Sequence, residues 1–133
     1  MKDILRTGDP VSFLGAECSV LSVRIKDDVQ TVCIICNDGF GHSSSTITDV
    51  NHASFSPLGV SPDWLERKGF EQVDTFSWEK RQTEGKVLVE FSEDLSESYF
   101  RAYKNDQAEP LVNWIKLRGA HHLLHLIEDV FSD

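Results

Sequence analysis

Two cysteines and two histidines in the first half of the chain have the atom types of a zinc site. Cys33, Cys36, His42 and His52 follow the pattern C-x2-C-x5-H-x9-H, and thiolate sulfur and imidazole nitrogen are the usual ligands of structural zinc. A turn at residues 37–39 could fold His42 back toward the thiols. The spacing matches no common zinc finger, so we expect buried strand cysteines and keep zinc as the alternative.

The same two cysteines do not have the setting of a redox motif. Cys33-Ile34-Ile35-Cys36 ends a β-branched run, whereas a thioredoxin-like C-x-x-C sits at a helix N-terminus. Residues three apart in a strand point to opposite faces, which separates the two sulfurs. The chain has three cysteines, an odd number, and its first residues lack the apolar core of a secretory signal. We therefore expect reduced thiols.

A second group of possible metal ligands lies near the end of the chain. His121, His125 and Glu128 are spaced to share one face of a helix, and a His-x-x-x-His pair can hold a metal. The H-E-x-x-H signature of zinc proteases is absent, so we expect packing or surface roles. The sequence also shows no hydrolytic triad motif and no phosphate-binding glycine loop. It thus predicts a protein that is not an enzyme and needs no cofactor.

Aromatic residues are concentrated in the second half of the chain, and most are expected in the core. The strand predicted over residues 98–104 alternates aromatic and polar side chains, which could leave Phe100 or Tyr103 exposed. Exposed aromatic side chains are frequent anchors of protein interfaces. Phe100 and Tyr103 are therefore our candidates for binding a partner.

Short strands separated by turns are predicted for residues 1–60. Residues 18–25 have a half-apolar period of two, which suggests a strand with one better-buried face, and residues 29–36 are a β-branched run of strand length. Residues 40–51 are rich in Gly, Ser, Thr and His and are expected to form a loop or an irregular edge. This pattern, without any helical period, predicts a small SH3-like β-barrel lobe.

Residues 61–133 are predicted to form a second lobe that mixes helices and strands. Ser61 is a suitable N-cap, Pro62 suits the first helical position, and Gly69 ends the helix. A sheet of three or four antiparallel strands follows, over residues 75–80, 86–92, 98–104 and 110–115. An apolar stripe at helical spacing predicts a last helix over residues 117–131. The expected fold class is α+β, with lobes 1–60 and 61–133 packed as one compact unit.

The charge balance bears on partners. Thirteen basic against 22 acidic residues give a net charge of −9, which opposes binding to nucleic-acid phosphates and to anionic lipid. No run approaches the length of about 18 apolar residues that a membrane span needs. The cytoplasm is the expected location.

Three segments of the chain resemble a set of uncharacterised proteins from Bacteroidetes genomes and their phages. The opening Leu5-Arg6-Thr7-Gly8-Asp9-Pro10-Val11 is similar to their "L-R-I-G-N-x-V". Pro57-Leu58-Gly59-Val60-Ser61, Trp64-Leu65 and Gly69-Phe70 resemble "P-I-x-L-T-x-x-x-L-x-x-x-G-F". The final helix, Ala120 to Ile127, resembles "V-H-Q-L-Q-N-L-Y", although Leu124 and His125 replace Gln and Asn.

That family has no known activity, so the resemblance implies two lobes and an origin in a phage or prophage. Together with the charge, it favours a non-enzymatic protein-interaction module. Such a module would bind a host or phage protein, and it could inhibit a host factor through an acidic surface. A small zinc-binding protein and a nucleic-acid-binding accessory protein built on the first lobe are the alternatives. A homodimer formed through an exposed sheet edge is also consistent with the sequence.

Overall fold

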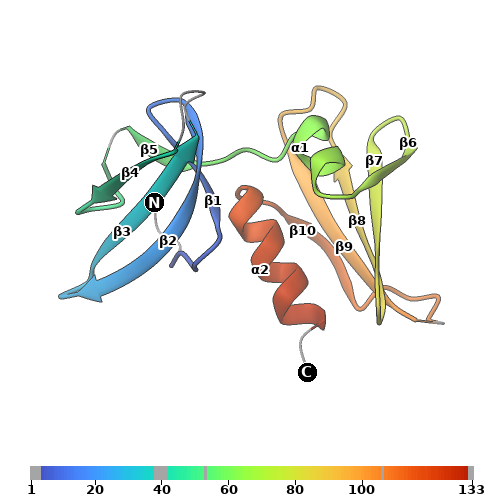
Figure 1. The fold of residues 1–133 in the computed structure, drawn as a ribbon. Coiled ribbons are helices and arrows are strands. Elements are labelled where there is room, and N and C mark those ends of the chain that lie inside the picture. Colours follow the sequence, from blue (N-terminus) through green and yellow to red (C-terminus); the bar gives the residue numbers. More distant parts are fainter. Residues whose placement is uncertain (1–3, 38–41, 53, 106, 132–133) are drawn as a thin grey trace. The chain divides into compact units, whose positions relative to one another are not determined.

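The computed structural model describes residues 4–37, 42–52, 54–105 and 107–131. The chain divides into two compact units, Met1–Leu58 and Gly59–Asp133 (Figure 1). Each unit is built around one five-stranded antiparallel sheet.

The sheet of the first unit has the strand order β4-β3-β2-β1-β5. Its strands are β1 (Pro10–Phe13), β2 (Ala16–Lys26), β3 (Val29–Asn37), β4 (His42–Ile47) and β5 (Phe55–Pro57). Two-residue turns at Leu14-Gly15 and Asp27-Asp28 join β1 to β2 and β2 to β3, with positive φ at all four residues. This is the geometry of the type I′ turn, whose twist matches that of the flanking strands. The segment at residues 40–51, expected to be a loop or an irregular edge, contains β4, which is a regular strand at the edge of this sheet.

One face of this sheet carries the core of the first unit. Val11, Val20, Val32 and Ile34 are at most 1% exposed. Further members of the same cluster are Leu5, Cys18, Cys36, Ile47, Val50 and Phe55. The expected β-branched strand over residues 29–36 thus supplies much of the core.

A β-bulge sets the register of the two longest strands. The pairing of β2 with β3 shifts by one residue between Val20 and Ser22. Without that shift Cys18 would face Asn37, but with it Cys18 faces Cys36. These two residues form a disulfide, with their Cα atoms 4.4 Å apart. The expectation of reduced thiols is therefore wrong for this pair, because an odd cysteine count says nothing about which residues a register brings together.

The sheet of the second unit has the order β10-β9-β8-β7-β6. Its elements are α1 (Pro62–Arg67), β6 (Glu71–Asp74), β7 (Ser77–Gln82), β8 (Gly85–Phe91), β9 (Ser98–Lys104), β10 (Val112–Lys116) and α2 (Ala120–Phe131). The Ser61 hydroxyl accepts a hydrogen bond from the Trp64 N–H at 3.2 Å, which confirms the predicted N-cap. Gly69 follows the helix with φ of 90°, the left-handed conformation that favours glycine.

The two faces of this sheet differ in burial. The buried cross-strand pairs of β8 and β9 are Val87–Ala102, Val89–Phe100 and Phe91–Ser98. The outer, partly exposed pairs are Lys86–Tyr103, Leu88–Arg101 and Glu90–Tyr99. The C-terminal end of α2 lies against this sheet, because a Cβ on Gly85 would come within 3.0 Å of the Phe131 ring.

The predicted α+β class is wrong, because strands dominate both units. The second sheet has five strands rather than three or four, and the two helices are only 6 and 12 residues long. In the first unit, the pairings of the described residues give an open sheet that starts at β4 and ends at β5, rather than a closed barrel. The helices of the described chain are all too short or too polar to span a membrane.

Candidate functional site

A second β-bulge turns a tryptophan out of the last strand. Val112 pairs with Ala102 and Ile115 pairs with Phe100, with a register shift between them. Ala102 and Phe100 are two positions apart in β9, whereas Val112 and Ile115 are three positions apart in β10. β10 therefore has one extra residue at this point, which defines a β-bulge. Trp114 absorbs the irregularity with φ of 52° and remains 44% exposed.

Arg101 holds this bulge from the neighbouring strand. Its guanidinium carbon lies 3.7 Å from the centroid of the Trp114 ring, a close cation–π contact. Its Nε donates a hydrogen bond to Asn113 Oδ1 at 2.9 Å, and its Nη1 donates to Tyr103 Oη at 3.3 Å. One side chain thus fixes both bulge residues and the neighbouring tyrosine.

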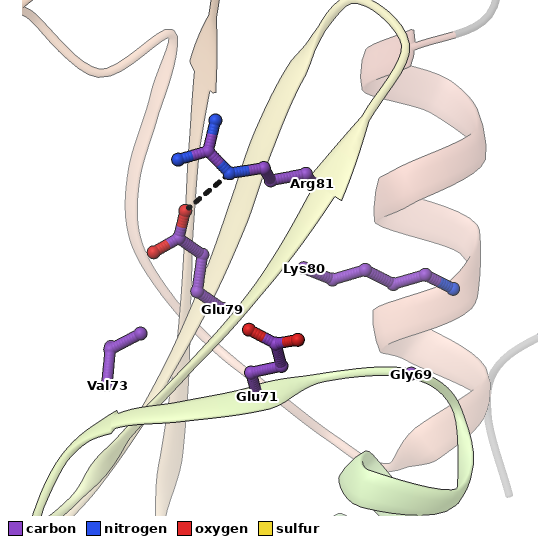
Figure 2. Close-up of a pocket in the computed structure, with 6 residues that line it drawn as sticks. All are labelled: Gly69, Glu71, Val73, Glu79, Lys80 and Arg81. Atoms are coloured by element: carbon purple, nitrogen blue, oxygen red, sulfur yellow. Dashed lines mark ion pairs between the residues drawn. The ribbon is translucent and has the colours of Figure 1, made fainter.

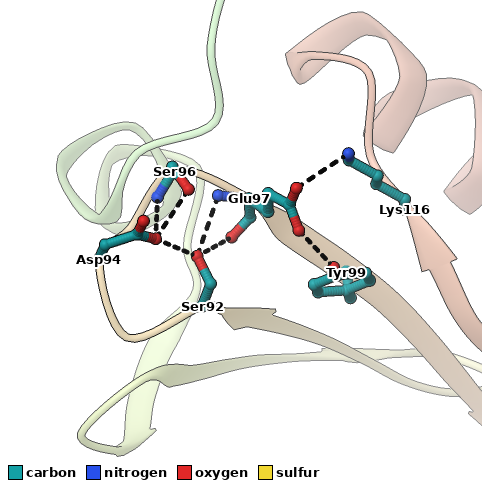
Figure 3. Close-up of polar contacts among 6 residues, drawn as sticks. All are labelled: Ser92, Asp94, Ser96, Glu97, Tyr99 and Lys116. Atoms are coloured by element: carbon teal, nitrogen blue, oxygen red, sulfur yellow. Dashed lines mark hydrogen bonds and ion pairs between the residues drawn. The ribbon is translucent and has the colours of Figure 1, made fainter.

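Tyr99 borders Trp114 and connects it to a charged pair. The two rings meet edge to face, with centroids 6.3 Å apart. Tyr99 Oη donates to Glu97 Oε2 at 2.6 Å, and Lys116 Nζ lies 3.1 Å from Glu97 Oε1 (Figure 3). The Tyr99 hydrogen bond, and then Lys116, lower the pKa of Glu97. The same bond raises the pKa of Tyr99, so both groups keep their ordinary charge at neutral pH.

The turn before Glu97 is held by a second carboxylate. Asp94 accepts hydrogen bonds from the hydroxyls of Ser92 and Ser96, both at 2.7 Å, and from the Ser96 N–H at 3.1 Å (Figure 3). Led by the Ser96 hydroxyl, these bonds lower the pKa of Asp94 to about 2. A fixed negative charge therefore stands at this end of the sheet.

A shallow depression of about 370 Å³ lies beside the tryptophan, lined by Glu90, Phe91, Ser92, Tyr99 and Trp114. Its walls are mainly apolar, and its polar side chains are the Glu90 carboxylate and the hydroxyls of Ser92 and Tyr99. We call this depression, together with Arg101 and Tyr103, the Trp114 surface. It contains no paired nucleophile and base, but an apolar side chain of another molecule could enter it.

The two aromatic residues predicted to bind a partner have different positions. Phe100 is fully buried at 0% exposure, so it cannot be an exposed anchor. Tyr103 lies on the partly exposed outer face, as proposed. Tyr99 and Arg101 are at alternate positions with Tyr103, so the period of two in β9 predicts that they lie on the same face. No sequence signal predicts the bulge that exposes Trp114.

The first group of predicted metal ligands is dispersed. Cys36 is bonded to Cys18, and Cys33 is a free cysteine that pairs with Thr46 of β4. His42 begins β4, opposite Asn37. The turn proposed at residues 37–39 lies largely outside the described residues. His52 Nδ1 accepts a hydrogen bond from the Ser54 N–H at 3.2 Å.

The second group of predicted metal ligands is partly brought together. The rings of His121 and His125 meet edge to face, with centroids 5.7 Å apart. His121 is fully buried and His125 is partly buried, whereas Glu128 is exposed. In the part of the chain that the structure describes, no group of three or more His, Cys, Asp or Glu side chains is arranged to hold a metal ion.

A second hollow, of about 480 Å³, lies between β6 and β7 (Figure 2). Glu71 faces Glu79 across the two strands, and Arg81 Nε lies 4.0 Å from Glu79 Oε1. The Arg81 side chain is 90% exposed, so this ion pair is weak. The Lys80 side chain points away from Glu79 and Arg81, to the opposite side of β7 (Figure 2), and its Nζ lies 5.9 Å from the centroid of the Phe70 ring. These exposed charges make a poorer anchor than the Trp114 surface.

Comparisons of the chain with protein-family models, curated proteins and solved structures find no match. The candidate site therefore rests on its own geometry.

Proposed function

We propose that the chain is a non-enzymatic protein-interaction module of phage or prophage origin that binds a host or phage protein through the Trp114 surface. Its proposed biological role is to inhibit a host factor. The resemblance to the phage-associated family supports the origin. The cytoplasm remains the proposed location, although the Cys18–Cys36 disulfide weighs against it because such bonds are rare in cytosolic proteins.

The observation that carries the proposal is the exposed Trp114 in a left-handed backbone conformation. A bulky side chain at positive φ is a rare and strained arrangement. Here the strained backbone conformation places a large aromatic side chain at the surface, where it contacts Arg101 and Tyr99. Tryptophan, tyrosine and arginine are the residues that most often dominate the energy of protein interfaces.

The charges around the depression favour a partner with basic groups. Glu90 lines the depression, and Asp94 and Glu97 lie in and next to the adjoining turn. The net charge of −9 adds a long-range attraction for a positively charged protein. The complex should therefore combine an apolar side chain placed beside Trp114 with salt-sensitive contacts at this acidic end.

Nucleic-acid binding is the second candidate, because one observation favours it. Lys86 and Arg101 flank Tyr103, and Lys86 Nζ lies 5.2 Å from the Tyr103 ring centroid. Cations beside exposed aromatic rings suit stacked single-stranded bases. The acidic residues of the same face and the net charge of −9 oppose this binding.

The test is a tagged pull-down from lysates of bacterial hosts, with the captured material analysed for protein and for nucleic acid. The unchanged chain is compared with Trp114→Ala and with Val73→Ala, which truncates an exposed apolar side chain of β6, at the opposite edge of the same sheet. We expect one stoichiometric protein that is retained by Val73→Ala, lost by Trp114→Ala and released as salt rises.

Two results would contradict the proposal. One is a protein captured equally by both variants, which would place the contact elsewhere. The other is capture of nucleic acid alone, lost on Trp114→Ala, which would favour the second candidate.

A further inference from the structure

The four strands at the ends of the two sheets are not equally protected against pairing with another strand. β5 has three residues and includes Pro57, which cannot donate a hydrogen bond. β6 carries Glu71 and Asp74 and has a register shift. β10 contains the Trp114 bulge and ends at Lys116. Short length, charge, proline and bulges are the devices that keep sheet edges from associating.

β4 shows none of these protective features over Ser43 to Ile47, the residues whose side chains the structure describes. From Ser43 to Ile47 it has no charged residue and no proline, and it pairs with β3 at all six positions without a register shift. Alternate residues of such an edge direct their N–H and C=O groups away from the sheet. A hollow of about 480 Å³ lined by Thr46, Ile47 and Phe13 lies at the end of the strand.

We propose that β4 pairs antiparallel with β4 of a second copy of this chain. In an edge strand, only alternate residues have backbone N–H and C=O groups that point outward, so each hydrogen-bonded pair across the new edge joins two such residues. The two-fold axis then passes beside a residue rather than between two residues. Pairing over the full length of β4 places it beside Ser44 or beside Ser45. In either register the central cross-strand pairs are serine with serine or serine with threonine, which can hydrogen-bond through their hydroxyls.

The side chains of β4 favour a second copy over a foreign strand. Strand addition by a peptide gains its specificity from pockets that take alternate side chains and from complementary charge. The exposed side chains here are small hydroxyls at Ser43, Ser44 and Thr46, which offer neither. The stretch from Ser43 to Thr46 is neutral and small, so it is instead complementary to itself, as a two-fold interface requires.

The charge of the chain gives this dimer a characteristic salt dependence. Each copy carries −9, so the two copies repel each other, and salt screens the repulsion. The dimer should therefore tighten as salt rises, whereas the partner complex proposed above should weaken. The two proposals are independent, because β4 belongs to the first unit and the Trp114 surface to the second.

The experiment is analytical ultracentrifugation of the full chain from ~1 µM to ~1 mM, at low and high salt. Ser44→Lys and Ser44→Glu place a charge at the centre of the proposed interface. Ser56→Lys is the matched control, because Ser56 is an exposed serine of β5 at the opposite edge of the same sheet.

We expect the unchanged chain and Ser56→Lys to dimerise, more strongly at high salt. Ser44→Lys and Ser44→Glu should each be monomeric when alone and should form a heterodimer when mixed, which also shows that both variants are folded. A chain that stays monomeric at every concentration, or a dimer that persists in both Ser44 variants, overturns the proposal.

Discussion

Trp114 joins a local backbone irregularity to the proposed partner-binding surface. The left-handed conformation costs a non-glycine residue about 1–2 kcal/mol, and the contacts with Arg101 and Tyr99 offset part of that cost. A glycine at this position would remove the strain but also the ring. The presence of tryptophan is thus easier to explain by binding than by folding.

The strain at Trp114 predicts an inverted order of two substitutions. Trp114→Gly should be more stable than Trp114→Ala by about 1 kcal/mol, because glycine adopts positive φ without steric cost. Urea unfolding of the two variants measures the difference. At Lys116, a regular position of the same strand, alanine should be the more stable of the two residues. If Trp114→Ala were instead more stable than Trp114→Gly, the backbone at this position would not be strained.

The contact between Tyr99 and Glu97 predicts a change in titration. Tyr99→Phe removes the main cause of the lowered pKa, so the pKa of Glu97 should rise toward its ordinary value of 4.5. Since the folded-state pKa of Glu97 is the lower one, its stabilising effect is complete above about pH 4.5 and is lost as pH falls through the folded-state pKa. Carboxyl NMR titration measures the pKa directly. Tyr103→Phe should leave it unchanged, and a shift equal in both variants would contradict this assignment.

Sequence alternation identified the outer face of β9 only in part. Tyr103 lies there, whereas Phe100 has the opposite parity and is buried. A bulge leaves no mark on hydrophobic periodicity, so the sequence does not distinguish Trp114 from the aromatic residues of the core. The pairing of Cys18 with Cys36 could not be predicted for the same reason, since it depends on the bulge in β2.

Two strands that the sequence does not predict as regular strands, β4 and β6, are both at sheet edges. β4 has serine or threonine at four of its six positions, and β6 is exposed throughout. An edge strand needs no alternating apolar face, so periodicity does not find it. The helix at residues 62–67 was easier to predict, because its cap, its proline and its terminal glycine are local signals.

The disulfide between β2 and β3 predicts a measurable loss of stability on its removal. It joins residues 18 positions apart, and closing a loop of that size is worth about 3 kcal/mol. Replacement of both Cys18 and Cys36 by serine should lower the free energy of unfolding by about this amount, measured by urea denaturation. Cys33→Ser should have a much smaller effect. An equally stable double variant would show that the bond does not support the first unit.

Gly85 marks a close contact between two strands and α2. A Cβ at this position would overlap the Tyr103 carbonyl oxygen and approach the Phe131 ring. Gly85→Ala should therefore destabilise the second unit by about 1–3 kcal/mol, measured by thermal unfolding. Gly59→Ala, where a Cβ meets nothing within 4 Å, should be nearly neutral. Equal melting temperatures for the two variants would argue against this packing.

At the scale of the whole molecule, the structure is two small five-stranded sheets on a strongly acidic chain. Composition alone predicts the charge and its consequences for partners, but the proportion of strand depends on polar edges that composition does not reveal. The chain thus presents two different surfaces, a neutral edge in the first unit and an aromatic face in the second.

The central claim is that a protein partner contacts the aromatic face of the second unit. It is tested most directly by replacing Tyr103 with a photoreactive aromatic residue and irradiating the chain in a host lysate. The same replacement at Leu14, an exposed residue of the first unit, is the control. We predict a protein adduct from position 103 that is absent from position 14 and is lost when Trp114→Ala is added. Identical adducts from both positions, or an adduct with nucleic acid alone at position 103, would contradict the account.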